Sequence, residues 1–337
     1  MVALLVASGA GCGRPLRFPL TAGASFEFSA YYQNDISGTA RPVLTGERDL
    51  IRTVYPVWYE VDAAGRVTDI GFDDDIKRVA DAAGIAVVPV VRNRSGPADD
   101  PAAALRKGAA AAVVERLRNL VRDHDFAGLN IDFAGLPGDM GDELLAFARD
   151  LWRAMHALGK RLVITVPALP DRKPAETAAY NYRQLSRVAD FIVLAAYDNH
   201  SSQTAPGPIA PLSWVNRSID QALRVIPAGK VILAVVAYGY DWPAGGPGLA
   251  ATTSAAAAYE LAREVGAAVG WDEDAHEATF SYSEAGAHRT VWFGDRRSVA
   301  ERVALARRRG LYGVAYWRLG QEEPGFWGSV EPAARGR

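Results

Sequence analysis

Two polar residues interrupt an apolar run in the segment Phe126–Pro137, which reads FAGLNIDFAGLP. Asn130 and Asp132 are two positions apart, so in a β-strand both side chains point to the same face. A carboxyl group held beside an amide at a strand end is suited to orienting a bound group or to moving a proton. A hydrogen-bonded structural pair in the interior is the alternative, because buried polar groups need partners.

Aromatic residues form the second set of candidates, and they lie at or beyond the C-terminal ends of apolar runs. They are Tyr31, Trp58, Tyr197, Tyr238, Tyr240, Trp242 and Trp317. A ring at such a position either packs in the core or lines a groove that binds substrate. His200 follows Tyr197 and Asp198 closely, and it is either a groove residue or an exposed loop histidine.

These residues lie on a repeating pattern of short strands and longer helices. Runs rich in β-branched and aromatic residues predict strands at Phe26–Tyr32, Leu50–Tyr59, Ile85–Arg92, Gly128–Phe133, Arg161–Val166, Phe191–Tyr197, Val231–Tyr238 and Leu311–Trp317. Helices are predicted between them at Asp73–Ala83, Ala102–His124, Asp142–Leu158, Tyr182–Ala189, Leu212–Ile226 and Ser298–Arg309. Most of the strands are continuously apolar, as strands buried on both faces are.

This alternation, repeated about eight times, predicts an α/β fold, the (β/α)8 TIM barrel. A doubly wound sheet is the competing architecture, but no Gly-x-Gly-x-x-Gly turn follows the first strand. In a barrel enzyme the working side chains lie at the C-terminal ends of the strands. We therefore expect Asn130, Asp132, Tyr197 and Trp317 to converge in one pocket at that end.

One stretch is too long to be a loop between a strand and a helix. Residues 243–293 contain a predicted helix, Ala255–Val265, and a hairpin-like pair, Ala278–Tyr282 and Thr290–Phe293. We interpret them as a small α+β insertion after the seventh strand. The barrel then spans residues 23–330, preceded by a leader or disordered start over 1–22 and followed by a tail over 331–337.

The composition excludes several classes of partner and cofactor. The chain has 337 residues, a formal net charge of −2 and a pI near 6.2, so no basic face for nucleic acid is expected. One cysteine excludes an intrachain disulfide, and the five histidines lack metal-ligand spacing, so neither metal nor cofactor is expected. No segment after the N-terminus has the ~20 apolar residues that a membrane span needs.

The N-terminus resembles the apolar region of a lipoprotein signal that ends at Cys12, the acylation site. Two features depart from that pattern, because no positive charge precedes the apolar run and Gly9 stands where leucine is preferred. A lipid anchor at Cys12 predicts an exported or cell-surface protein. If this segment is not a leader, a cytoplasmic protein is expected instead.

Four segments together resemble glycoside hydrolase family 18. Phe126–Pro137 is similar to its signature strand, Asp-x-x-Asp-x-Asp-x-Glu, and Ala195–His200 is similar to its Met-x-Tyr-Asp element. Pro206–Pro211 and Tyr238–Trp242 resemble segments of bacterial members related to spore cortex hydrolases and to deacetylase-fused forms. Gly313–Gly320 resembles the tryptophan-bearing eighth strand. Their order along the chain makes the resemblance specific.

The resemblance implies substrate-assisted hydrolysis of glycans that contain N-acetylglucosamine, such as chitin-like polysaccharide or peptidoglycan. In the family a glutamate protonates the leaving oxygen while the acetamido carbonyl of the substrate attacks the anomeric carbon. By this resemblance Asp132 and Asp198 would orient the acetamido group, and Tyr197 would donate a hydrogen bond to its carbonyl. Trp317 would form the floor of the sugar subsite. Asn130 matches an acidic position at which asparagine is a frequent variant.

Ala134 stands where the family has its catalytic glutamate, and a methyl group cannot donate a proton. Asp139, Asp142 and Glu143 follow closely, but they are expected to cap the next helix and to pair with its dipole. General acid–base catalysis contributes typically ~10²–10⁴-fold to a rate, so its loss is severe.

The sequence therefore predicts a family 18-like protein that binds an oligosaccharide or polysaccharide and whose hydrolysis is impaired or lost. One alternative is a hydrolase that recruits another acid, or whose glutamate was replaced experimentally. Another alternative is a surface interaction protein with a plugged groove.

Overall fold

The computed structural model describes residues 26–34, 38–47, 49–94, 100–106, 108–171, 177–243 and 250–336. Cys12 and the predicted leader therefore lie outside the described residues. Within the described residues, none of the helices combines the length and the apolar character needed to cross a membrane.

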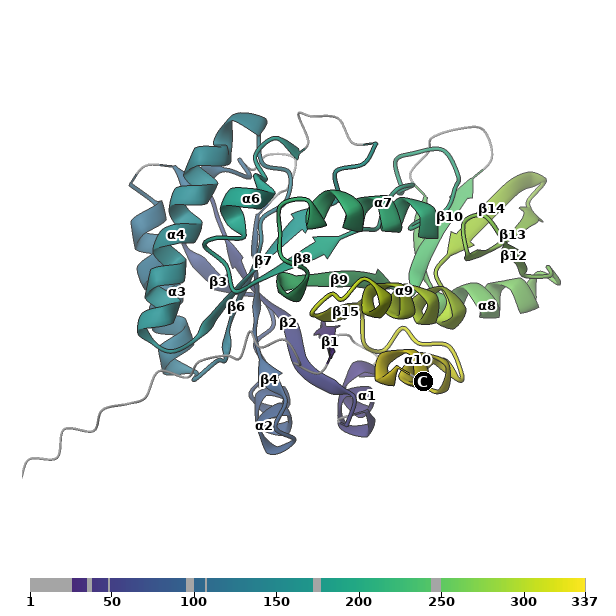
Figure 1. Cartoon of the computed structure of the whole chain (residues 1–337). Coiled ribbons are helices and arrows are strands. Elements are labelled where there is room, and N and C mark those ends of the chain that lie inside the picture. Colours follow the sequence, from purple (N-terminus) through teal and green to yellow (C-terminus); the bar gives the residue numbers. More distant parts are fainter. Residues whose placement is uncertain are drawn as a thin grey trace, which may run out of the picture.

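Eight parallel strands close into a barrel, which confirms the predicted (β/α)8 fold (Figure 1). They are β1 (Glu27–Tyr32), β2 (Ile51–Val61), β5 (Val90–Asn93), β6 (Gly128–Asp132), β7 (Arg161–Pro167), β8 (Phe191–Ala195), β9 (Val231–Val236) and β15 (Gly313–Trp317). The ring closes because β1 pairs in parallel with both β15 and β2. Two short strands, β3 (Val67–Asp69) and β4 (Ala86–Val87), also pair with β2.

Helices surround the barrel on its outer face (Figure 1). They are α1 (Ala40–Gly46), α2 (Asp74–Ala82), α3 (Ala110–Asp123), α4 (Gly141–Ala157), α6 (Tyr182–Leu185), α7 (Leu212–Leu223), α9 (Arg296–Arg308) and α10 (Phe326–Arg335). Local chemistry sets where some of them begin. The side chain of Asp73 accepts hydrogen bonds from the amides of Asp75 and Ile76 at the start of α2, and Asp295 caps α9 in the same way.

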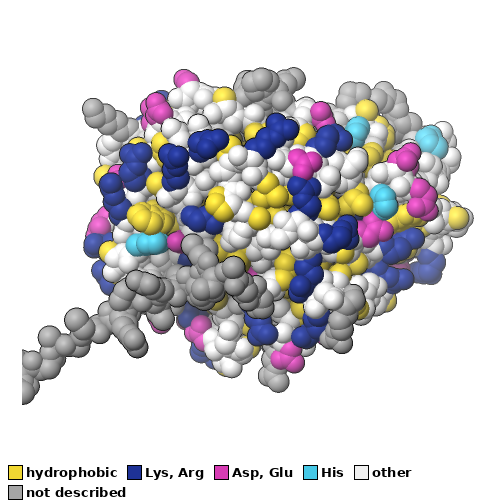
Figure 2. Space-filling model, viewed as in Figure 1, with side chains coloured by type: hydrophobic (Ala, Val, Ile, Leu, Met, Phe, Trp, Pro, Cys, Tyr) yellow, Lys and Arg dark blue, Asp and Glu magenta, His cyan; other side chains and the backbone are white. Residues whose placement is uncertain are grey.

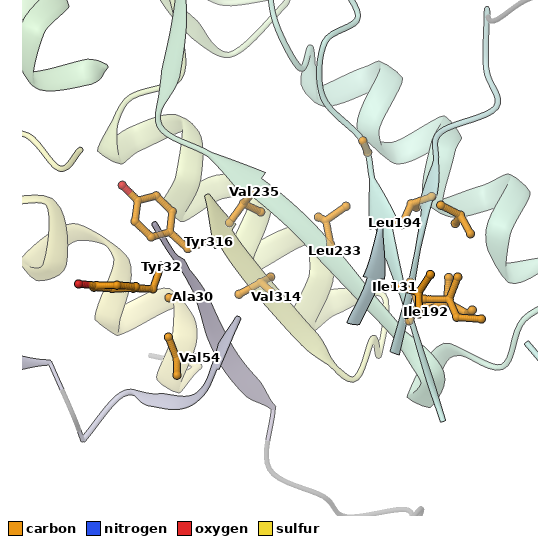
Figure 3. Close-up of a cluster of buried hydrophobic side chains, with 14 of the residues drawn as sticks. Ala30, Tyr32, Val54, Ile131, Ile192, Leu194, Leu233, Val235, Val314 and Tyr316 are labelled. Atoms are coloured by element: carbon orange, nitrogen blue, oxygen red, sulfur yellow. The ribbon is translucent and has the colours of Figure 1, made fainter. Parts of the chain in front are cut away.

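Alternation along each strand divides the buried side chains into two layers. In β1, Tyr31 packs inside the barrel, whereas Ala30 and Tyr32 face the helices. Figure 3 shows part of the outer layer, in which Val54, Leu233, Val314 and other apolar side chains project from neighbouring strands.

The insertion after β9 forms a second, antiparallel sheet of order β11-β10-β14-β13-β12, seen beside the barrel at the right of Figure 1. Its elements are β10 (Tyr238–Pro243), β11 (Ala251–Ser254), α8 (Ala255–Glu264), β12 (Gly270–Asp272), β13 (Glu277–Glu284) and β14 (Ala287–Phe293). It begins at Tyr238 rather than at residue 243, because the apolar run 231–238 divides at Ala237 between the two sheets.

Three other predicted boundaries differ from the structure. The run Ile85–Arg92 divides at Val88-Pro89 into β4 and β5, since proline has no amide hydrogen for the sheet. The predicted helix Ala102–His124 is a short 3₁₀ turn (Ala103–Leu105) followed by α3. Residues 331–335, predicted as a tail, continue α10, where Ala334 is buried and its carbonyl accepts hydrogen bonds from Arg307.

A buried ion pair holds the insertion against the barrel. Glu277 of β13 and Arg302 of α9 lie 3.2 Å apart and are almost completely inaccessible to solvent. Glu277 also accepts hydrogen bonds from the amides of Ile209 (2.7 Å) and Ala210 (2.8 Å), in the loop after β8. One carboxylate therefore joins the insertion, a barrel helix and a loop at the mouth of the barrel.

We expect Glu277→Gln to lower the free energy of unfolding by about 3 kcal/mol, because it leaves the guanidinium of Arg302 buried without a counter-charge. Urea unfolding followed by far-UV circular dichroism measures the change. Glu331→Gln is the matched control, since Glu331 pairs with Arg335 on the exposed surface of α10. A Glu277→Gln variant as stable as this control would contradict the role given to the ion pair.

Candidate active site

A cavity of about 680 Å³ opens at the C-terminal ends of β6, β7 and β8. This volume is in the range of small-molecule sites. Its described lining comprises Asp132, Phe133, Ala134, Gly135, Leu136, Pro137, Thr165, Pro167, Tyr180, Ala195, Tyr197, Asp198, Ser201 and Gln203. The structure thus brings Asp132, Tyr197 and Asp198 together at the end of the barrel where the sequence predicts a site.

Asn130 lies directly beneath the cavity and is completely buried. Its side-chain oxygen accepts a hydrogen bond from the Thr165 hydroxyl (3.0 Å), and its amide group donates to the Tyr31 hydroxyl (3.4 Å). Both the donor and the acceptor functions of the amide are therefore used within the protein. Asn130 supports the floor of the cavity, as the structural interpretation of its position predicts.

Asp132 is the ionisable group at the end of β6, and it opens partly to the cavity. Burial raises the pKa of Asp132 to about 6, while the positive charge of Arg92 acts in the opposite direction. Arg92 is the register partner of Asp132 on the neighbouring strand β5. A carboxyl group in this state exchanges its proton near neutral pH.

Tyr197 faces Asp132 across the cavity, and burial raises the pKa of its hydroxyl well above the ordinary range. The tyrosine therefore stays protonated and remains a hydrogen-bond donor under all physiological conditions. Asp198 follows it with a positive φ of 55° and accepts hydrogen bonds from the hydroxyls of Tyr238 and Tyr240, the latter at 2.9 Å. Tyr238 and Tyr240 are thus buried partners of Asp198 rather than open groove residues.

Trp317 joins the site through the inner layer of the barrel. Its ring centroid lies 5.1 Å from that of Tyr31, and it packs with Tyr197 in the same apolar cluster. Its partial exposure at the end of β15 leaves some of the ring free for contact. Asn130, Asp132, Tyr197 and Trp317 therefore lie at the same end of the barrel, but Asn130 and Trp317 are not among the described residues that line the cavity.

Trp58, Trp242 and His200 are not among the described residues that line the cavity. Trp58 is completely buried on the outer face of β2, where its ring packs on Phe72 and Phe126. Its neighbour Val57 takes the inward position, so strand alternation excludes Trp58 from the barrel interior. Trp242 is also fully buried. His200 is held by a hydrogen bond between its ring and the carbonyl of Ala205 (3.0 Å), and Ser201 and Gln203 line the cavity instead.

Ala134 is exposed in the cavity wall, and its backbone is held on both sides by one side chain. The amide of Ala134 donates to the Asn93 side-chain oxygen (2.9 Å), and its carbonyl accepts from the Asn93 amide group (2.9 Å). The position is therefore well defined although it carries only a methyl group. Among the described residues of the lining, only Asp132 and Asp198 bear carboxyl groups.

The acidic residues after Ala134 do not replace a glutamate in the cavity. Asp142 and Glu143 are exposed in the first turn of α4, where they line a different cavity together with Arg106. Asp139 is exposed in the 3₁₀ turn Gly138–Met140 and is absent from the described lining of the cavity with Asp132. Their positions fit stabilisation of the helix dipole.

Three supporting residues were not predicted from the sequence: Asn93, Thr165 and Tyr180. Apart from Arg161 at its start, Thr165 is the polar residue of β7, and it stands two positions after the inward Val163, a signal that could have revealed it. Asn93 gives a weaker signal, as a polar residue at the end of β5. Tyr180 lies in a connecting segment without periodicity, and its hydroxyl donates to the carbonyl of Phe133 (2.7 Å).

The sequence model named Glycosyl hydrolases family 18 matches residues 101–322, more than half of the chain. The chain belongs to this family. The matched segment contains β6, β7 and β8, which carry the strand-end residues of the cavity, and β15, which carries Trp317.

Relatives within family 18 include glycosylases of Bacillus subtilis (strain 168). The chain is 26% identical over 228 residues to the uncharacterized glycosylase YvbX, which covers 66% of this chain and 65% of that protein. It is 32% identical over 218 residues to a cortical fragment-lytic enzyme, which covers 61% of this chain and 49% of that enzyme. The chain thus spans about half to two thirds of the length of these relatives.

Solved structures of similar proteins have the same barrel. A chitinase from Chromobacterium violaceum superimposes with a TM-score of 0.85 at 28% identity, covering 93% of this chain and 100% of that structure. The spore cortex-lytic enzyme SleL of Bacillus megaterium has a TM-score of 0.81 at 22% identity, covering 91% of this chain and 73% of that structure. The similarity to SleL therefore shows only that the two proteins share a fold.

Asp132→Asn should reveal the cost of ionising a buried carboxyl group. A folded-state pKa near 6 lies above the unfolded value, so this group stabilises the protein fully below about pH 4, and that stability is lost as the pH rises through 6. We expect the variant to gain about 1–2 kcal/mol in unfolding free energy relative to the parent between pH 4 and pH 7.

Denaturant unfolding at several pH values measures this difference. Asp123→Asn is the control, because Asp123 is an exposed carboxylate on α3. A stability difference between Asp132→Asn and the parent that does not change with pH would show that Asp132 has an ordinary pKa.

Proposed function

We propose that this family 18 protein binds glycans containing N-acetylglucosamine, chitin-like or peptidoglycan, and cleaves them poorly or not at all. One observation carries the proposal: Ala134 lies in the wall of a cavity that retains Asp132 and Tyr197. The groups suited to holding the sugar are present, and the position for the proton donor carries a methyl group. A cavity of about 680 Å³ also counts against a plugged groove.

The retained groups favour recognition of an acetamido sugar. Tyr197 supplies a permanent hydrogen-bond donor for the acetamido carbonyl, since burial raises its pKa. Asp132 accepts a hydrogen bond from the acetamido N–H when it is ionised. The exposed part of the Trp317 ring offers an apolar surface for a pyranose face.

Hydrolysis needs a group that these contacts do not provide. The leaving oxygen of a sugar must be protonated as the glycosidic bond breaks, and that interaction belongs to the transition state. Asp198 is a poor substitute because two tyrosine hydroxyls already donate to it. Binding and cleavage should therefore be separable in this protein.

We expect the parent protein to bind N-acetylglucosamine oligomers with near-zero turnover, and Ala134→Glu to gain hydrolysis by about 10²-fold or more. Calorimetry measures the affinity, and reducing-end release measures the turnover. Ala112→Glu is the matched control, because it adds a carboxylate to the exposed face of α3. Asp132→Asn placed in the Ala134→Glu background should abolish the gain.

Two outcomes would contradict this proposal. Robust hydrolysis by the parent that persists in Asp132→Asn would place the catalytic groups elsewhere. A complete lack of binding to N-acetylglucosamine oligomers would instead favour an interaction protein. In the Ala134→Glu variant, NMR titration should also show a higher pKa for Asp132, because a second carboxylate disfavours its ionisation.

A second candidate function is slow hydrolysis with Asp132 itself as the proton donor. The observation that favours it is the pKa of about 6, which leaves part of this carboxyl group protonated near neutral pH. It predicts turnover in the parent that falls as the pH rises through 6 and disappears in Asp132→Asn. The absence of turnover at pH 5 would exclude it.

A further inference from the structure

A second cavity, of about 570 Å³, lies on the flank of the barrel between α6 and α7. Its lining comprises Leu169, Tyr180, Asn181, Tyr182, Arg183, Gln184, Arg187, Gln221, Arg224 and Val225. Three of these side chains are arginines, and none of the described lining residues is acidic. We call this cavity the arginine pocket.

The arginines of this pocket are unpaired among the residues that the structure describes. Arg183, Arg187 and Arg224 are exposed, and within the described part of the chain none of the three side chains has an ion pair or a hydrogen bond. By contrast, Arg217, also on α7, pairs with Asp171 at 2.9 Å. Two other cavities on the described surface mix both signs: Arg106 lies with Asp142 and Glu143 in one, and Arg116 lies with Asp69 and Asp123 in the other. Three like charges without counter-charges are suited to an anionic ligand.

The surface around the arginine pocket is also positively charged. Figure 2 shows dark blue Lys and Arg side chains that run as a band across the side of the molecule formed by α4, α6 and α7. The chain as a whole carries a formal net charge of −2, so this band is a local concentration of positive charge. A local positive field of this kind attracts an extended anion more strongly than a single charged group.

The arginine pocket adjoins the candidate active site. Tyr180 lines both cavities, and its hydroxyl donates to the carbonyl of Phe133, the residue before Ala134. Tyr182 lies in the same wall, with its hydroxyl donating to the carbonyl of Pro167, which lines the central cavity. One layer of tyrosine side chains therefore separates the two, and a polymer can contact both.

We propose that the arginine pocket binds carboxylate groups carried by the same glycan strand whose sugar occupies the central cavity. This inference rests on the proposed function and names its substrate class as an acidic glycan. The lactyl ether of N-acetylmuramic acid bears such a carboxylate wherever the stem peptide of peptidoglycan has been removed, whereas chitin-like polysaccharide is neutral. Guanidinium groups bind carboxylates through paired N–H···O bonds, and the amides of Asn181, Gln184 and Gln221 supply further donors.

The test compares three glycans of equal length: N-acetylglucosamine oligomers, oligomers that alternate N-acetylglucosamine with N-acetylmuramic acid, and the latter after methyl esterification. The triple variant Arg183→Gln/Arg187→Gln/Arg224→Gln should lose about tenfold or more in affinity for the acidic oligomer, because it removes three exposed positive charges that contact the carboxylates. It should bind the neutral and esterified oligomers as the parent does. The loss should shrink as salt concentration rises.

The control variant is Arg78→Gln/Arg118→Gln/Arg263→Gln, which removes the same charge from exposed positions outside this lining and outside α4, α6 and α7. Equal losses in both triple variants, or none in the pocket variant, would overturn the inference while neutral binding still supports the central cavity. If the parent protein does not bind the neutral oligomers but still binds the acidic oligomer, that result would count against the proposed function only. Competition by poly(glycerol phosphate), but not by the acidic oligomer, would replace the carboxylate with a phosphate ligand and so overturn the proposal.

Discussion

The closure of eight parallel strands is the constraint on which the site depends. Because β1 pairs with both β15 and β2, the strands cannot slip or open, and side-chain alternation has a fixed inside and outside. Asn130 and Asp132 on β6, Tyr31 on β1 and Trp317 on β15 are far apart in the chain, yet they meet at one end of the ring. A shift of one residue in any of these strands would turn its working side chain towards the helices.

The interior that this closure creates gives the polar groups their properties. Burial raises the pKa of both Asp132 and Tyr197, so one becomes an acid active near neutral pH and the other a permanent donor. Asn130 and Asn93 do not ionise, but both hold parts of the cavity in place. Asn130 accepts a hydrogen bond from Thr165 below the cavity, and Asn93 bonds to the backbone of Ala134 in its wall. The backbone of Ala134 is therefore held in place by Asn93, although its side chain carries no proton donor.

The surroundings of the cavity carry a second set of constraints. Glu277 and Arg302 attach the insertion, whose Tyr238 and Tyr240 reach back to Asp198. On the other side, Tyr180 forms a wall shared with the arginine pocket. The central cavity thus adjoins a positively charged flank built by α6 and α7, and its lining residue Asp198 is held by two tyrosines of the insertion.

The sequence by itself determined the barrel, the strand that carries Asp132, the absence of glutamate at position 134 and the membership suggested by four ordered motifs. These follow from local patterns, because apolar runs and two-residue alternation depend on neighbours along the chain. Only the tertiary structure decided that Trp58 faces the helices, that Tyr238 and Tyr240 bind Asp198, and that Asn93 holds Ala134. It alone also gathered Arg183, Arg187 and Arg224 into one pocket. Such contacts join residues distant in sequence, and their geometry is set by the packing of strands, helices and insertion rather than by any local pattern.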